Sequence, residues 1–152
     1  MNIFILDYDI EKCVKAYVDK HVVKMPIEYT QMLSTACRYH GLDVGYGITH
    51  RNHPCNIWAR ESLSNWLWLK TLAYHTNREW QFRYQHTYDH ASWDVARRLP
   101  IPKIKEIGLT PFPVCTNGID LNDAVESYRE YYRRDKRHLA SWSRRTKPYW
   151  WR

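Results

Sequence analysis

Apolar residues recur every three to four positions along most of the chain, which is the spacing of an amphipathic α-helix. A short apolar run at positions 1–6 precedes them and predicts either one strand or an extended lead-in. Asp9 can cap a first helix, and Pro26 suits a first helical turn better than a helix interior. These features predict helices at about 10–22 and about 26–39.

The rest of the chain alternates helical segments with loops. A glycine-containing loop at 41–53 leads into a helical segment at about 54–84, in one piece or two, because glycine and proline are absent after its first residue. A proline-rich extended segment at 100–119 precedes a last helix at about 121–142 and a tail at about 143–152. The expected caps are Gly41, Asn52 and Asp120. We therefore expect a mostly α, compact, single-domain helical bundle.

Composition narrows the class of protein. Aromatic residues make up 15% of the chain, with 8 Trp and 12 Tyr, whereas disordered chains contain few of them. No apolar run approaches the ~20 residues of a membrane span, and Asp7 and Asp9 interrupt the only candidate for a signal peptide. The four cysteines form no closely spaced pair, so we expect reduced thiols in a cytoplasmic protein without a membrane partner.

Charge suggests a partner. The net charge is +7, and residues 121–152 carry nine lysines and arginines against four acidic residues, interleaved with Tyr and Trp. Phosphates attract cationic side chains, and unstacked bases stack on aromatic rings. The pattern therefore predicts binding of nucleic acid or a nucleotide, although a solvated helix face with a tail packed on the core is the structural alternative. The candidate contacts in the tail are Arg144, Arg145, Lys147 and Trp150.

The densest polar cluster spans residues 19–31. Glu28 and Gln31 are three positions apart, so they share one helical face at the rim of the apolar stripe. A carboxylate at such a rim can do acid–base chemistry if cations hold it, and the candidate cations are Lys20, His21 and Lys24. These three residues and Gln31 are also the candidates on this segment for holding phosphates or a flipped base. The structural alternative makes Glu28 an acid of the first helical turn, where the helix dipole favours it.

A second cluster lies where the glycine-containing loop enters the next helix. Helix N-termini attract anions, so side chains at this point could hold a phosphate or a base edge, unless they only cap the helix. These side chains are His50, Arg51, Asn52 and His53. His50 and His53 could also join Cys55 at a metal ion, but the sequence offers no evident fourth ligand, so we expect neither metal nor cofactor.

The order Lys24-x-x-x-Glu28-x-x-Gln31, then Asn52-His53-Pro54 and Trp58, resembles small phage and bacterial proteins of the pyrimidine-dimer DNA glycosylase (endonuclease V) superfamily. The resemblance spans about residues 19–85, and the C-terminal Lys-Pro-Tyr-Trp-Trp is also similar to that family's aromatic tail. It implies a compact helical domain over the whole chain, base flipping and cleavage of a glycosidic bond. It also implies that Glu28 is catalytic and that the protein acts in the cytoplasm, the host's if a phage encodes it.

Three functions follow from these observations. The leading hypothesis is a DNA glycosylase-like enzyme that acts on damaged or modified pyrimidines in DNA. Members of that family use the α-amine of a processed N-terminal residue as nucleophile. An asparagine at position 2, as in this chain, usually prevents removal of Met1. Glu28 could then assist a water molecule instead. A non-catalytic pocket, such as a phage sponge for cyclic-nucleotide defence signals, and a transferase on hypermodified phage pyrimidines stay open. The position of the N-terminal amine relative to Glu28 separates them.

Overall fold

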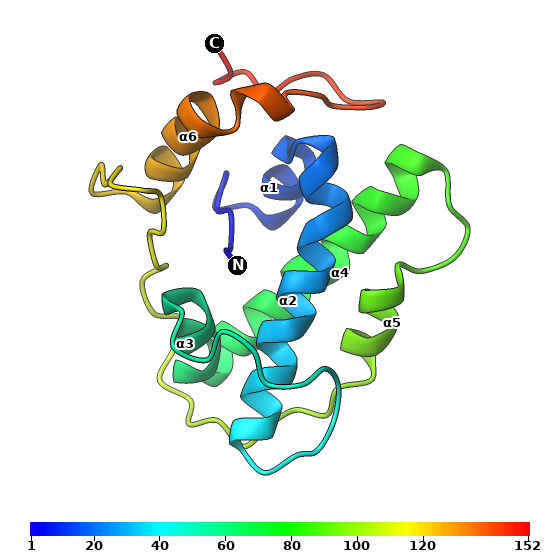
Figure 1. Ribbon diagram of the computed structural model, residues 1–152, viewed down its shortest axis with the longest axis vertical. Coiled ribbons are helices and arrows are strands. Elements are labelled where there is room, and N and C mark those ends of the chain that lie inside the picture. The colour runs from blue at the N-terminus through cyan, green and yellow to red at the C-terminus, as the bar shows by residue number, and fades with distance from the viewer.

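The computed structural model describes residues 1–152 and contains helices but no strand, which confirms the expected mostly α fold (Figure 1). The elements are α1 (Ile10–Ala16), α2 (Asp19–Tyr39), α3 (Pro54–Glu61), α4 (Leu63–Tyr84), α5 (Ala91–Arg97), α6 (Ala124–Asp135) and a 3-10 turn, η1 (Arg137–Leu139). None of these helices combines the length and the apolarity that crossing a membrane requires.

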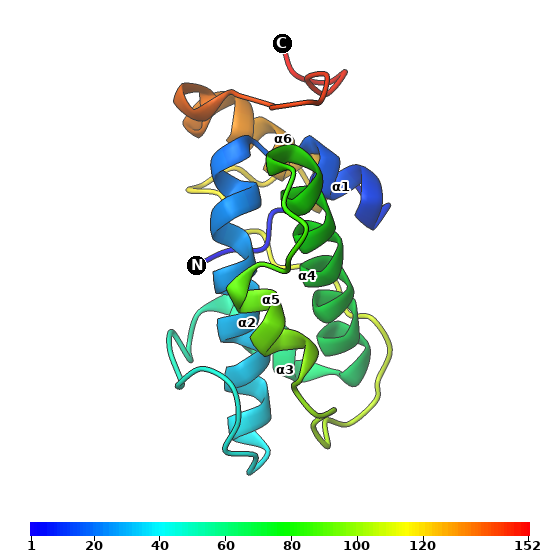
Figure 2. The same ribbon diagram turned by 90° about the vertical axis from the view of Figure 1, so that its right-hand side faces the viewer.

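The two longest helices, α2 and α4, lie side by side in opposite directions, and α5 packs against both (Figure 2). The face of α2 that meets α4 buries Met25, Tyr29, Met32 and Leu33, which follow helical spacing. Trp66 of α4 is fully buried, and its indole N–H donates to the Leu33 carbonyl at 3.2 Å. Burial of this apolar stripe holds the central pair together.

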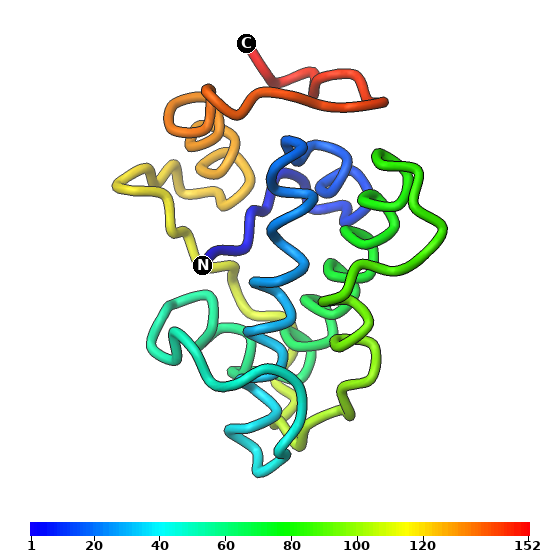
Figure 3. Tube along the Cα trace, turned by 45° about the vertical axis from the view of Figure 1, so that its right-hand side comes forward, coloured from blue at the N-terminus to red at the C-terminus, as the bar shows by residue number.

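The first six residues form an extended segment in the core between α2 and α6 (Figure 3). Ile3 to Leu6 are each at most 5% exposed, yet no strand pairs with them. Side chains satisfy their carbonyls instead: the Tyr17 hydroxyl donates to Phe4 at 3.0 Å and Arg129 Nε donates to Leu6 at 2.9 Å. This burial fixes the amino end of the chain in the middle of the molecule.

The predicted break between the first two helices is wrong. α1 ends at Ala16, and α2 begins at Asp19 and continues through Pro26. Proline lacks the N–H of a helical hydrogen bond, so an interior proline costs stability. The buried residues on both sides of Pro26 keep this part of α2 in the core, and their burial offsets that cost.

Two further helix boundaries differ from the sequence-based expectation. α5 was not predicted; it is short, and its cap is His90, whose Nδ1 accepts from the Ser92 N–H at 3.1 Å. The last helix begins after Asp123, which accepts from the Glu126 N–H, rather than after Asp120, and it ends at Asp135. The segment from 54 to 84 is two helices, as one of the expected arrangements had it.

The C-terminal tail packs on the core. The carboxylate of Asp19 accepts hydrogen bonds from the backbone N–H of Ser143 and the hydroxyl of Ser141, and the indole of Trp142 donates to the Ala16 carbonyl at 2.9 Å. Trp150 is only 7% exposed and lies against the ring of Tyr132. The structural alternative weighed for the tail, packing on the core, therefore holds for these residues.

His21 belongs to the core as well. Its ring stacks on Phe4 with centroids 4.4 Å apart and bonds the Tyr132 hydroxyl. Burial, and then the positive charges of Lys136 and Lys24, lower the pKa of His21 to about 3. The expectation that His21 holds a phosphate or a base is therefore wrong, because its buried ring stays neutral and faces other rings.

We expect the free energy of unfolding to fall by about 2 kcal/mol between pH 7 and pH 5 because of His21 alone. The unfolded ring binds a proton near pH 6.5, whereas the folded ring does so only near pH 3, so stability is complete above pH 6.5 and is lost as the pH falls through this window. Urea unfolding at several pH values measures it, with His21→Gln as the control. An equal pH dependence in both proteins would contradict the assignment.

Candidate functional site

Glu28 lies more than two turns inside α2, so it is not an acid of the first helical turn. Its side chain is 10% exposed and both carboxylate oxygens are engaged. Oε1 lies 3.1 Å from Lys24 Nζ, one turn earlier on the same face, and Oε2 accepts from the Asn2 N–H at 2.9 Å. Oε2 also lies 3.8 Å from the α-amino nitrogen of Met1. The carboxylate predicted from the sequence therefore stands beside an amine.

Asn2 holds the amino end of the chain in this place. Its side-chain amide donates to the Cys115 carbonyl at 2.9 Å. Its side-chain oxygen accepts from the Tyr128 hydroxyl at 2.7 Å and from the Ile3 N–H at 2.8 Å. The Met1 sulfur lies 3.8 Å from the amide nitrogen of Asn56 in α3. The α-amine is thus fixed by contacts to α2, α3, α6 and the loop before α6.

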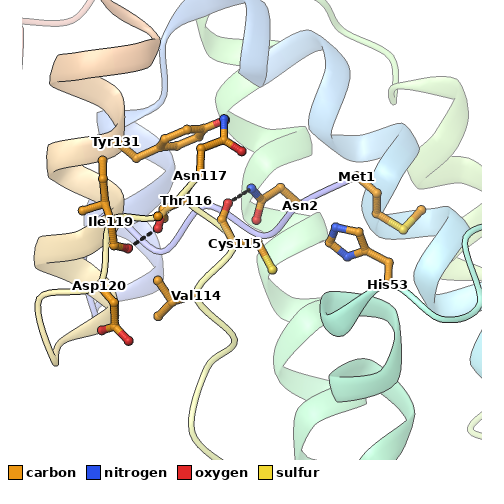
Figure 4. Close-up of a pocket in the computed structure, with 11 residues that line it drawn as sticks. Met1, Asn2, His53, Val114, Cys115, Thr116, Asn117, Ile119, Asp120 and Tyr131 are labelled. Carbon is orange, nitrogen blue, oxygen red and sulfur yellow. Dashed lines mark hydrogen bonds between the residues drawn. The ribbon is translucent and has the colours of Figure 1, made fainter.

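A pocket of about 470 Å³ opens next to Met1 (Figure 4). Met1, Asn2 and His53 form one side, and the loop 114–120 with Tyr131 forms the other. This volume falls in the range of small-molecule pockets, roughly 300–1,000 Å³, and is large enough for one nucleoside. Glu28 does not line the pocket itself and lies behind Met1 and Asn2.

His53 is the cap of α3, in place of the expected Asn52, and its Nδ1 accepts from the Cys55 N–H at 3.2 Å. Burial lowers the pKa of His53 below its ordinary value, and the α-amine and His50 lower it further while Glu28 opposes them. The ring is therefore neutral at pH 7. A neutral imidazole at the pocket wall can exchange a proton or bind a metal ion.

The structure brings together only part of the predicted set. Lys24, Glu28 and His53 surround the amine, and Lys20 is exposed one turn before Lys24. Gln31, half-buried, follows Glu28 on α2, and the exposed loop before α3 carries the remaining polar candidates. These are His50, Arg51 and Asn52.

The tail residues lie elsewhere. In Figure 1 the tail crosses the end of the molecule opposite α3. Trp150 is buried and therefore offers no ring for a base, which corrects the sequence-based expectation. Arg145 pairs with Glu79 at 2.9 Å, and Arg144 and Lys147 are exposed. The tail therefore does not share a site with Glu28.

Several residues of the site could not be identified from the sequence. Asn2 and Cys115 are 113 positions apart, and the residues of the loop 114–120 do not differ in type from those of an ordinary connection. Cys115 also lies near His53 and Cys55, and the potential ligand atoms of the three residues all lie within 4.8 Å of one another.

Comparison of the chain with models of known protein families, with characterised proteins and with solved structures found no match.

Proposed function

We propose that this protein removes a damaged or modified pyrimidine from DNA by cleaving its N-glycosidic bond. The observation that carries the proposal is the 3.8 Å separation between the Met1 α-nitrogen and the Glu28 carboxylate. An amine is a nucleophile once it loses its proton, and a carboxylate beside it can take that proton. In this structure the amine beside Glu28 is that of Met1.

The chemistry balances with these two groups. Glu28 first takes a proton from the Met1 ammonium. The lone pair of the Met1 nitrogen then forms a bond to C1′ of the deoxyribose while the bond from C1′ to the base breaks, and the base leaves with that electron pair and receives the proton from Glu28 through water, which leaves Glu28 a carboxylate again. Glu28 takes the proton from the new ammonium, the nitrogen forms an imine to C1′, and the bond from C1′ to O4′ opens. Glu28 then returns the proton to O4′.

The surroundings favour this use of Glu28. Lys24 and the Asn2 N–H engage its two oxygens and hold the carboxylate in one orientation toward the amine. The pocket beside Met1 offers an extruded base side chains that can form hydrogen bonds, such as Thr116, Asn117 and Asp120. Enzymes that act on a base in duplex DNA take it out of the stack into such a pocket.

Binding of duplex DNA is expected to weaken steeply with salt, with a slope of roughly −3 in a plot of log affinity against log salt concentration. Lys20 and Lys24 of α2 and Arg51 of the loop before α3 are exposed cations, and each phosphate that they neutralise contributes about −0.9. Fluorescence anisotropy at several salt concentrations measures the slope. The double variant Lys20→Gln/Arg51→Gln should reduce its magnitude by about 2.

The matched control for this measurement is Arg144→Gln, which removes an exposed cation from the tail. Its slope should equal that of the wild type, because the tail lies at the other end of the molecule. A slope that responds to Arg144→Gln and not to the double variant would place the DNA on the tail and contradict this site.

The function is tested on duplex oligonucleotides that carry one uracil, 5-hydroxymethyluracil, thymine glycol or cyclobutane pyrimidine dimer. We expect mass spectrometry to detect the released base for at least one of them. Borohydride added during the reaction should trap a covalent protein–DNA adduct at Met1, which peptide mapping would locate. Absence of base release from every substrate would overturn the proposal, and release without an adduct would replace the amine with water as nucleophile.

A second function is favoured by the position of Glu28 outside the pocket lining: the pocket could hold a nucleotide without cleaving it. In that case a nucleotide should co-purify with the protein, or a nucleotide panel should raise its melting temperature. Base release with no such binding would exclude this second function.

A further inference from the structure

We propose that His53, Cys55 and Cys115 form a binding site for a soft divalent metal ion of the zinc type at the edge of the pocket. The three residues come from the cap of α3, the first turn of α3 and the loop before α6. Their ligand atoms lie within 4.8 Å of one another. Two thiolates and an imidazole are the ligands that zinc prefers in proteins.

The distance between the two sulfur atoms fits this use. Cys55 Sγ lies 3.9 Å from Cys115 Sγ. Two sulfurs bound to one tetrahedral zinc ion, each at about 2.3 Å, are about 3.8 Å apart. A disulfide requires about 2.05 Å, so the sulfurs would have to approach each other by almost 2 Å. The arrangement is therefore already that of two ligands on one ion.

The charges also agree. Two thiolates neutralise a divalent cation, and an imidazole ligand adds no charge, so the filled site carries no net charge. Cys55 is buried, and His53 and Cys115 are half-buried, so an uncharged site suits this place. Ligands bind the ion in their deprotonated form, so binding releases protons.

His53 must give up one contact. Its Nδ1 now accepts from the Cys55 N–H, so either the metal takes that lone pair or the ring carries its proton on Nδ1 and binds through Nε2. In both cases His53 Nδ1 no longer accepts the capping hydrogen bond from the Cys55 N–H. The ring is half-buried at the pocket wall and lies beside Met1, where it can make this adjustment (Figure 4).

The fourth position is the remaining element of a tetrahedral site. No fourth His, Cys, Asp or Glu belongs to the group, and both His53 and Cys115 line the pocket. A site with three protein ligands and one position open to a pocket can bind water or an anionic ligand there. This inference concerns ion binding alone and does not depend on the proposed cleavage of a glycosidic bond.

Cobalt(II) is the probe that tests the site, because tetrahedral thiolate coordination gives intense visible bands and a sulfur-to-metal charge-transfer band. We expect reduced, chelator-treated full-length protein to bind one Co²⁺ with these bands, and added Zn²⁺ to remove them. Cys115→Ser should lose the charge-transfer intensity of one thiolate and bind at least about tenfold more weakly. His53→Asn, which preserves a capping side chain, should also bind more weakly.

Cys37→Ser is the matched control, since Cys37 is another buried free thiol outside the group. Its Co²⁺ spectrum should equal that of the wild type, and circular dichroism should show that every variant is folded. The proposal is overturned if reduced wild-type protein with Co²⁺ shows no more than the pale spectrum of hexa-aqua cobalt. It is also overturned if Cys37→Ser loses as much of the spectrum as Cys115→Ser. A third contrary result is reduced protein that binds no Co²⁺ and forms a Cys55–Cys115 disulfide in air.

Discussion

Glu28→Gln is expected to lower the rate of base release by about a thousandfold, within the range of roughly 10²–10⁴ for general acid–base groups. Glutamine has the same shape and keeps an oxygen that accepts from the Asn2 N–H, so the fold around Met1 should persist. It cannot take a proton from the Met1 amine 3.8 Å away or return one to the opening sugar. The loss therefore measures proton transfer more than packing.

Single-turnover kinetics with excess enzyme isolates this step from product release. Circular dichroism and the DNA affinity of Glu28→Gln should stay close to those of the wild type. Lys24→Met is the matched comparison, because it removes the ion pair at Oε1 but leaves the carboxylate next to the amine. We expect a loss of about tenfold in the single-turnover rate at saturating enzyme, since Lys24 orients the carboxylate but exchanges no proton with the amine. A Glu28→Gln rate within threefold of the wild type, on the order of 0.7 kcal/mol, would remove Glu28 from the chemistry.

The helices were predictable where local chemistry decides them. The apolar spacing of Met32, Leu33, Ala36 and Cys37 identifies the buried face of α2, although Ile27, expected on the same face, is exposed. Asp9 caps α1 as expected and accepts from the Lys12 N–H at 3.0 Å. The helix boundary predicted at Pro26 is wrong, because a local rule ends a helix where tertiary packing continues it. α5 has only seven residues and a histidine cap, which gives little periodic pattern to detect.

The site was predictable only in its local part. Lys24 and Glu28 are four positions apart, so helical geometry alone brings them together. The contacts of Asn2 to Glu28 and to Cys115 join residues 26 and 113 positions apart, and no helical or strand period reports such pairs. The sequence places His21 in a polar cluster with Lys20 and Lys24 and predicts a cation there, whereas its position on α2 directs its ring at Phe4.

Sequence spacing also fails to identify most partners of Arg83, a buried charge with many contacts. The side chain of Arg83 is fully buried, and it pairs with Glu79 at 2.7 Å and with Asp19 at 3.0 Å. It also donates to the carbonyls of Tyr17 and Lys15 at 2.7 and 3.0 Å. It thereby joins the end of α4 to the connection between α1 and α2, where the tail is anchored through Asp19.

Arg83→Met is expected to lower the free energy of unfolding by about 3–5 kcal/mol, because it removes one of the two arginines that pair with the buried Glu79 carboxylate and leaves several carbonyls without their donor. For a chain of this length the melting temperature should fall by about 10 °C. Urea unfolding followed by tryptophan fluorescence measures the change. Arg78→Met, on the exposed face of the same helix, is the control and should change stability by less than about 0.5 kcal/mol.

The double variant Glu79→Met/Arg83→Met separates an unpaired charge from lost packing. When both partners become apolar, no buried carboxylate is left with only one of its two arginines, so the double variant should be less destabilised than the sum of the single variants. Arg145 limits the recovery, because it also binds Glu79, at 2.9 Å, and loses that partner in the double variant. Exact additivity of the two single losses would mean that Arg83 stabilises the fold through its carbonyl contacts rather than through Glu79.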